Sequence, residues 1–188
     1  MLKLFAPHDA TKDILDRYLD AHFYVAAAGK HAPTIREVGR VAKKLGCRFP
    51  KEFVVHSTGR FGGAYVEVKE EFWPRPKEYE VGPFWSFLYG LWVFGFADGV
   101  PDWMSLELAA DTFRHETGSA NVPCLKIVGD ADLFAFTQAG AIVQWHHETG
   151  EFTPFNGGFF ALFEHQVKAL RERKDQKLAA ARLPDPAE

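Results

Sequence analysis

The feature that most constrains the fold is a series of four short apolar runs in the last third of the chain. The runs span residues 125–128, 133–136, 141–147 and 151–155, and each break between them contains a glycine. Runs of this length, rich in Val, Ile, Phe and Trp, are typical of β-strands, and such short breaks join antiparallel neighbours. The pattern predicts an antiparallel meander.

An amphipathic helix is expected directly after this meander, over residues 158–173. Its apolar stripe consists of Phe159, Leu162, Phe163, Val167 and Leu170, which recur at helical spacing. Such a stripe covers one face of a sheet. Beyond Arg173 the sequence becomes polar and ends in LPDPAE, so we expect residues 174–188 to form a frayed tail.

Helical spacing also marks the N-terminal part of the chain. The first predicted helix begins at Asp9 or Thr11 and runs to Gly29, so residues 1–33 are interpreted as a helical extension. Thr34 and Glu37 then form a capping box for a second helix, which ends at Gly46. The stripe of the first helix is Ile14, Leu15, Tyr18, Leu19, His22 and Phe23.

The middle of the chain alternates turn residues with aromatic residues. Pro50 opens a short helical turn, and the pair Gly62 and Gly63 leads into a strand at 65–68. The aromatic run over 84–96 predicts a buried strand or strand pair, and Asp102 is the expected cap of a third helix. We assign structural roles to Pro50, Gly62, Gly63 and Trp145.

Composition supports one ordinary core. The chain has 188 residues, 47% of them apolar and 25% charged, which excludes wholesale disorder. No apolar run reaches the ~20 residues that a membrane-spanning helix needs. The N-terminus has no secretory h-region, and only Cys47 and Cys124 could form a disulfide, so we expect a cytoplasmic protein.

Charge is distributed unevenly along the chain. Residues 1–66 carry 11 bases and 6 acids, whereas residues 67–116 carry 4 bases and 10 acids, together with most of the tryptophans. An aromatic and acidic surface suits a basic protein partner. The candidate contact residues are Trp73, Glu78, Asp98 and Asp102, with Trp73 as the anchor because Pro74 and Pro76 place it on a loop.

Two alternatives to this acidic surface stay open. The aromatic run can be a core strand bracketed by solvated charge. Trp73 can also be buried, with the basic N-terminal half binding an acidic partner or nucleic acid. Arg36, Arg40 and Lys43 share one face of the second helix, but such a face is usually only solvated, so nucleic acid is not the expected partner.

Motifs for catalysis, metal or cofactor binding are absent from the sequence. His146 and His147 are adjacent in a predicted strand and so point to opposite faces. Asp130 and Asp132 lie at a tight turn, where turn hydrogen bonding is the simpler role. No phosphate loop, GxSxG or HExxH motif occurs, so we expect no catalytic residue, no metal and no cofactor.

The order of these signals resembles the SUKH superfamily. The matching residues are the helix end Lys44-Leu45-Gly46, the turn Phe49-Pro50-x-x-Phe53, with Phe where Leu is usual, and Gly62-Gly63 entering a strand. A second block agrees over 128–134 and 140–147, followed by the closing helix. The resemblance covers residues 34–173. The N-terminal helix precedes the family's usual start, and Arg60-Phe61 replaces the polar residue that often leads the glycine pair.

This resemblance implies an α+β fold with a central, mostly antiparallel sheet flanked by amphipathic helices. It also implies no catalytic residues to transfer, and binding as the function. SUKH proteins include bacterial immunity proteins, which block the toxins of polymorphic toxin systems, often nucleases or other toxic enzymes. A regulator of yeast cell-wall synthesis belongs to the same superfamily. The resemblance therefore implies a cognate toxin as the partner; a non-catalytic regulatory scaffold and a small enzyme are the alternatives.

Overall fold

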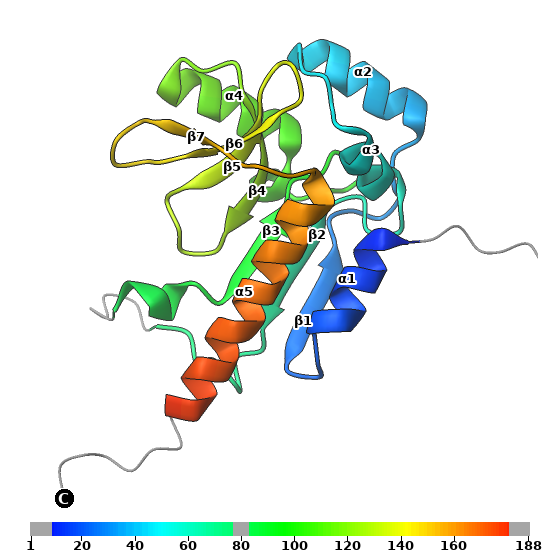
Figure 1. Ribbon diagram of the computed structural model, residues 1–188. Coiled ribbons are helices and arrows are strands. Elements are labelled where there is room, and N and C mark those ends of the chain that lie inside the picture. Colours follow the sequence, from blue (N-terminus) through cyan, green and yellow to red (C-terminus); the bar gives the residue numbers. More distant parts are fainter. Residues whose placement is uncertain (1–8, 77–82, 181–188) are drawn as a thin grey trace, which may run out of the picture.

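The computed structural model describes residues 9–76 and 83–180, and they form an α+β fold (Figure 1). The sheet has seven strands, in the order β1 to β7, and every neighbouring pair is antiparallel. The fold class predicted from the sequence is confirmed. None of the helices in the described ranges is both long and apolar enough to cross a membrane. The strands are β1 (Phe23–Ala27), β2 (Ala64–Val68), β3 (Gly90–Val93), β4 (Val122–Ile127), β5 (Leu133–Phe136), β6 (Ile142–Trp145) and β7 (Phe152–Pro154).

Five α-helices and two 3₁₀ turns, η1 and η2, connect and cover these strands in the described residues. They are α1 (Ala10–Tyr18), α2 (Ile35–Leu45), α3 (Lys51–Thr58), η1 (Phe84–Phe87), η2 (Asp102–Met104), α4 (Leu106–Thr117) and α5 (Phe159–Ala180). In Figure 1, α5 crosses the strands β2 and β3, and α1 lies beside it. The predicted stripe of α5 is fully buried, so the meander and the closing amphipathic helix are confirmed. The helix packs mainly on β3 rather than on the meander, so that part of the prediction is wrong.

Local sequence signals explain several of these elements. Thr34 and Glu37 form the expected capping box at α2, and Gly46 ends that helix in the left-handed conformation. Pro50 is the N-cap of α3. Gly63 has a φ of 113°, and a Cβ there would lie 2.7 Å from the Cβ of Ala28. The positive φ and this close contact explain why a glycine suits position 63.

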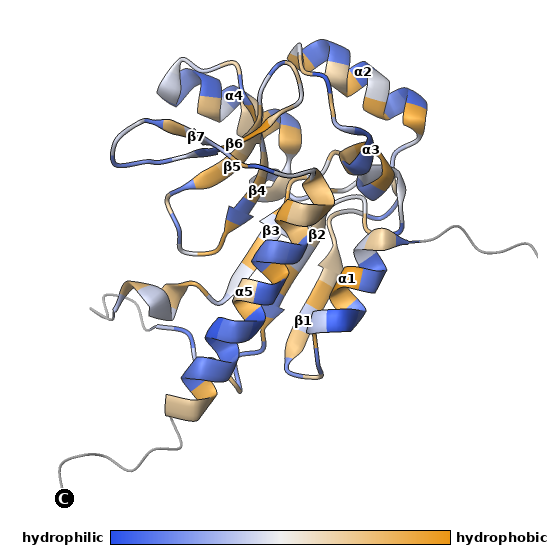
Figure 2. Ribbon diagram, viewed as in Figure 1, coloured by the Kyte–Doolittle hydropathy of each residue, from blue (hydrophilic) through white to orange (hydrophobic). Residues whose placement is uncertain are grey.

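The N-terminal segment differs from its prediction. Helix α1 ends at Tyr18, and residues 23–27 form strand β1, which pairs with β2 over its whole length. Figure 2 shows β1 as a largely apolar strand. The helical spacing of His22 and Phe23 with α1 was coincidental, because Leu19 is already extended. The interpretation of residues 1–33 as a helical extension is therefore wrong: part of this segment is the edge strand of the sheet.

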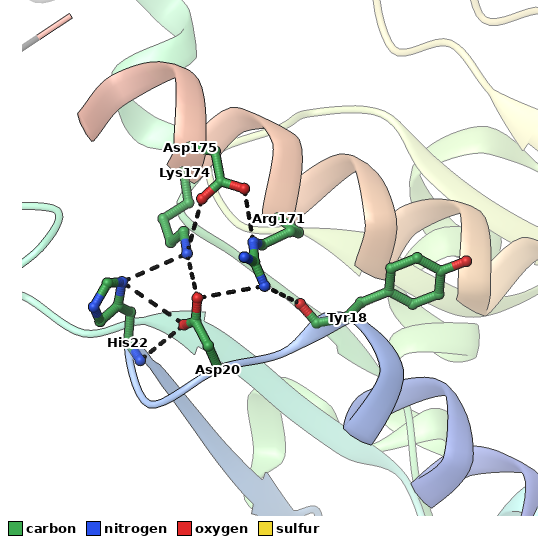
Figure 3. A network of polar contacts seen from close by, with 6 residues as sticks. All are labelled: Tyr18, Asp20, His22, Arg171, Lys174 and Asp175. Carbon is green, nitrogen blue, oxygen red and sulfur yellow. Dashed lines mark hydrogen bonds and ion pairs between the residues drawn. The ribbon is translucent and has the colours of Figure 1, made fainter. Parts of the chain in front are cut away.

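The predicted frayed tail is also wrong from residue 174 to residue 180, where α5 continues. Lys174 is almost completely buried, and its Nζ lies 2.7 Å from Asp20 and 3.0 Å from Asp175 (Figure 3). Arg171 donates a hydrogen bond to the carbonyl of Tyr18 and lies 3.3 Å from the same Asp20 carboxylate. A polar sequence is thus ordered here by a charge network. The predicted tail residues 181–188 lie outside the described residues.

The middle of the chain needs two smaller corrections. The aromatic run forms the short turn η1 and one strand, β3, so only its second half is strand. The third predicted helix begins later than expected, because the Ser105 hydroxyl accepts from the Leu108 N–H and caps α4, while Asp102 belongs to η2. Both differences move aromatic side chains into solvent, since Phe84, Trp85 and Trp103 are about half exposed or more.

Candidate functional site: an open aromatic face of the sheet

Trp73, the anchor expected from the sequence, lies in the core. Its side chain is 0% exposed, and its indole N–H donates to the carbonyl of Ser86 at 2.9 Å. The ammonium of Lys177, from α5, lies 5.2 Å from the ring centroid. The prolines place Trp73 on a loop, but α5 covers that loop. The prediction of an exposed Trp73 is therefore wrong, and its burial is the alternative that the sequence left open.

The three acidic candidates have different outcomes. Glu78 lies outside the described residues. Asp98 is exposed, and its carbonyl accepts a hydrogen bond from the Lys30 N–H. Asp102 is exposed at the start of η2, directly before the exposed Trp103. Among the predicted contact residues that the structure describes, Asp102 is the one directly followed by an exposed aromatic residue, Trp103 of η2.

The pairing register shows which side chains share a face of the sheet. Directly paired residues point to the same side, and the partners Tyr24–Glu67, Tyr65–Trp92, Trp92–Lys126 and Lys126–Leu133 connect β1 to β5. Helix α4 packs on β4, and its Phe113 lies edge-on to Trp145 of β6. It therefore covers the β4–β6 part of this face. We call the remainder, Tyr24, Tyr65, Glu67, Trp92 and Trp103, the open face.

Three aromatic rings form the centre of the open face. Trp103 lies edge-on to both Tyr65 and Trp92, with centroid separations of 5.5 Å in each case. Trp103 is 54% exposed and Tyr24 is 50% exposed. The buried indole N–H of Trp92 has no acceptor in the described part of the chain. An unsatisfied buried donor of this kind usually costs about 1–3 kcal/mol.

Polar contacts hold Tyr65 and Glu67 of the open face in place. The Tyr65 hydroxyl donates to Glu67 at 2.7 Å, and Arg75 donates to the same carboxylate oxygen at 2.8 Å. The Arg75 guanidinium also lies 3.8 Å from the ring centroid of Tyr89. Burial, and secondly the Glu67 carboxylate, raises the pKa of Tyr65. The tyrosine therefore remains a hydrogen-bond donor at neutral pH, and the rings are held in place.

One hollow adjoins the open face, and a second hollow lies next to the first. The first, of about 370 Å³, lies between η2, α4 and the sheet, and its lining includes Trp103, Leu108, Phe113, Lys126 and Trp145. The second, of about 540 Å³, lies over the meander. Its lining includes Phe84, Asp130, Asp132, His146, Glu148 and Glu151. Ala131 and His147 line both hollows, so the two are neighbours.

Hydrogen bonds organise the second hollow. One oxygen of Asp132 accepts from the His147 N–H, and the other lies 2.9 Å from Nδ1 of His146. Nε2 of His146 lies 2.9 Å from the Thr153 hydroxyl. Partial burial disfavours the Asp132 carboxylate, but these hydrogen bonds outweigh it and lower its pKa. The Asp130 side chain accepts from the Asp132 N–H, as expected of turn chemistry.

The other candidate chemical groups do not converge on this surface. Cys47 and Cys124 are buried free thiols, and burial raises the pKa of Cys47 to about 11. His56 lies in the core beside Thr11 rather than beside a cysteine. In the described ranges, no three His, Cys, Asp or Glu side chains gather as metal ligands.

Sequence reasoning overlooked Tyr24, Tyr65 and Trp103 as surface candidates. A usable signal existed for one of them, because Tyr65 and Glu67 alternate with the buried Val66 and Val68. Trp103 carries no comparable local signal. Comparisons of the chain with protein-family models, with curated proteins and with solved structures found no match. The assignment of a function therefore depends on the motifs in the sequence and on the geometry of this surface.

Proposed function

We propose that this protein is an immunity protein that binds and neutralises a cognate toxin of a bacterial polymorphic toxin system. The observation that carries the proposal is the open face, where Tyr24 of β1 and Trp103 of η2 are about half exposed beside a part of the sheet that α4 does not cover. Tryptophan and tyrosine in such positions are typical of interface hot spots. The SUKH-like order of motifs supports the same function, which is exercised in the cytoplasm and requires no catalysis or cofactor.

Protection of cells from the toxin tests this proposal directly. The proposal requires a neighbouring gene for a long chain with a toxic C-terminal domain, and that domain is produced in a bacterial host, with and without the full chain. We expect survival only with the chain, and a complex of fixed stoichiometry on size-exclusion chromatography. Toxicity that persists at equal expression, with no complex, contradicts the proposal. Weak binding to several cell-wall synthesis proteins instead supports the regulatory scaffold.

A second candidate function, hydrolysis, is favoured by one observation. Asp132, His146 and Thr153 form a carboxylate–imidazole–hydroxyl series, the order found in hydrolase relays, beside the second hollow. With the proton on Nδ1, His146 donates to Asp132 and can accept from Thr153. A panel of fluorogenic esters and amides tests this function. Turnover that disappears in Thr153→Val and His146→Gln supports it, whereas equal background rates in all three proteins contradict it.

A further inference from the structure

We propose that the binding surface extends from the open face into the hollow over the meander, and that its occupant is a basic segment of the partner protein. This inference rests on the proposed function and specifies the partner's chemistry. The segment places an apolar side chain beside Trp103 and lysine or arginine side chains over the meander. Three observations connect the open face with the hollow over the meander.

The first observation is proximity. The hollow beside Trp103 and the hollow over the meander share Ala131 and His147 in their linings, so one extended chain segment can contact both.

The second observation is charge. Six acidic residues line the two hollows, against one lysine, Lys126. Of the six, only Asp132 contacts a basic side chain, His146, in the described part of the chain. The others are Asp102, Glu116, Asp130, Glu148 and Glu151. None of these five makes an ion pair there, although Asp130 interacts electrostatically with the Arg173 guanidinium. Complementary charge on a partner raises the association rate and selects against acidic partners, nucleic acids included.

The third observation is the division between apolar and charged lining. Phe113, Trp145 and Leu133 make the floor near Trp103 apolar, whereas acids dominate the hollow over the meander. Asp132 is held by the His147 N–H and the His146 ring, so this carboxylate is fixed on the β5–β6 connection rather than free to turn away. An apolar anchor flanked by positive charges matches this order of features.

The inference is tested with two synthetic heptapeptides titrated into the full-length ¹⁵N-labelled protein. One has six lysines around a central phenylalanine, and the other replaces the lysines with glutamates. We expect the lysine peptide to shift the Trp103 indole N–H and the amides of Ala131 and His147, and the glutamate peptide to shift none of them. The lysine peptide should shift the same signals at low and at moderate salt concentration, and it should bind more weakly at the higher concentration, because salt screens the charges.

Charge variants localise the effect. Asp130→Asn, Glu148→Gln and Glu151→Gln together remove three acids from the hollow and should weaken lysine-peptide binding at least tenfold. Asp130→Asn keeps the oxygen that accepts from the Asp132 N–H. The matched control changes three exposed acids elsewhere, Glu70→Gln, Glu71→Gln and Glu172→Gln, and should have less than a threefold effect.

Equal losses in the two triple variants overturn the inference, as do shifts confined to other surfaces or equal binding of both peptides. Cell protection measures the proposed function independently of these peptides. A chain that protects cells but shows no preference for the lysine peptide therefore refutes the basic segment and leaves the immunity function intact.

Discussion

At the scale of single residues, the buried imidazole of His56 makes the fold sensitive to acid. The ring is 1% exposed among Phe53, Phe159 and Phe163, and its Nε2 has no partner in the described residues. Burial lowers the pKa of His56 from 6.5 to about 3. The folded state therefore favours the neutral ring. This stability is present above pH 6.5 and is lost as the pH falls toward 3.

We expect the free energy of unfolding to fall by up to about 1.4 kcal/mol per pH unit over this window because of His56 alone. Urea denaturation at pH 7.5, 5.5 and 4.5 measures the slope for the wild type and for His56→Gln. The variant should lack this contribution, whatever its absolute stability. Identical slopes for the two proteins would show that His56 does not titrate with folding.

Two glycines give opposite predictions for the same substitution. Gly63→Ala should destabilise the fold by about 2 kcal/mol or more, because the positive φ and the close Ala28 Cβ oppose a side chain. Gly39 is exposed inside helix α2, with free space around a Cβ, so Gly39→Ala should stabilise by about 0.5–1 kcal/mol. Thermal unfolding compares the two variants. An unchanged stability of Gly63→Ala would contradict the requirement for a glycine at position 63.

At the scale of elements, the charge network of Lys174 fastens α5 to the connection between α1 and β1 (Figure 3). Asp20→Ala leaves the buried ammonium of Lys174 with the Asp175 carboxylate and with Nδ1 of His22, 3.5 Å away. We expect a loss of about 1–3 kcal/mol, less than for a fully buried pair, because Asp20 is 33% exposed. The surface pair Lys12–Asp16 is the control, and Asp16→Ala should cost less than about 1 kcal/mol.

A double-mutant cycle with Lys174→Met isolates the interaction of Lys174 with Asp20. Chemical denaturation of the two single variants and the double variant should give a clear coupling energy. Additive losses would mean that the ion pair between Lys174 and Asp20 does not stabilise the fold. The end of α5 beyond Arg173 would then be stabilised independently of the N-terminal segment.

The elements that could be predicted from the sequence are those with local causes. The meander follows from alternation and glycine turns, and α2 follows from the capping box of Thr34 and Glu37. Strand β1 could not be predicted in this way, since its pairing partner β2 lies about 40 residues further along the chain. Ordering of α5 beyond Arg173 depends on Asp20, 154 residues away from Lys174.

At the scale of the whole molecule, the candidate site was only partly predictable for the same reason. The sequence indicated an aromatic and acidic surface and named Asp102, but it placed the anchor at Trp73. Which tryptophan is buried depends on the packing of α5 over the Trp73 loop and on the position of α4 over the sheet. The acids that line the hollow over the meander lie outside residues 67–116, the acidic segment that the charge distribution indicated.

The most direct test of the proposed function is the affinity of the full chain for the cognate toxin domain that the proposal requires, measured by calorimetry for the wild type and two tryptophan variants. Trp103 and Trp85 are 54% and 49% exposed, but only Trp103 lies on the open face. The account predicts that Trp103→Ala raises the Kd at least ~30-fold, about 2 kcal/mol, while Trp85→Ala changes it less than about threefold. A wild-type Kd for a folded Trp103→Ala protein would contradict it.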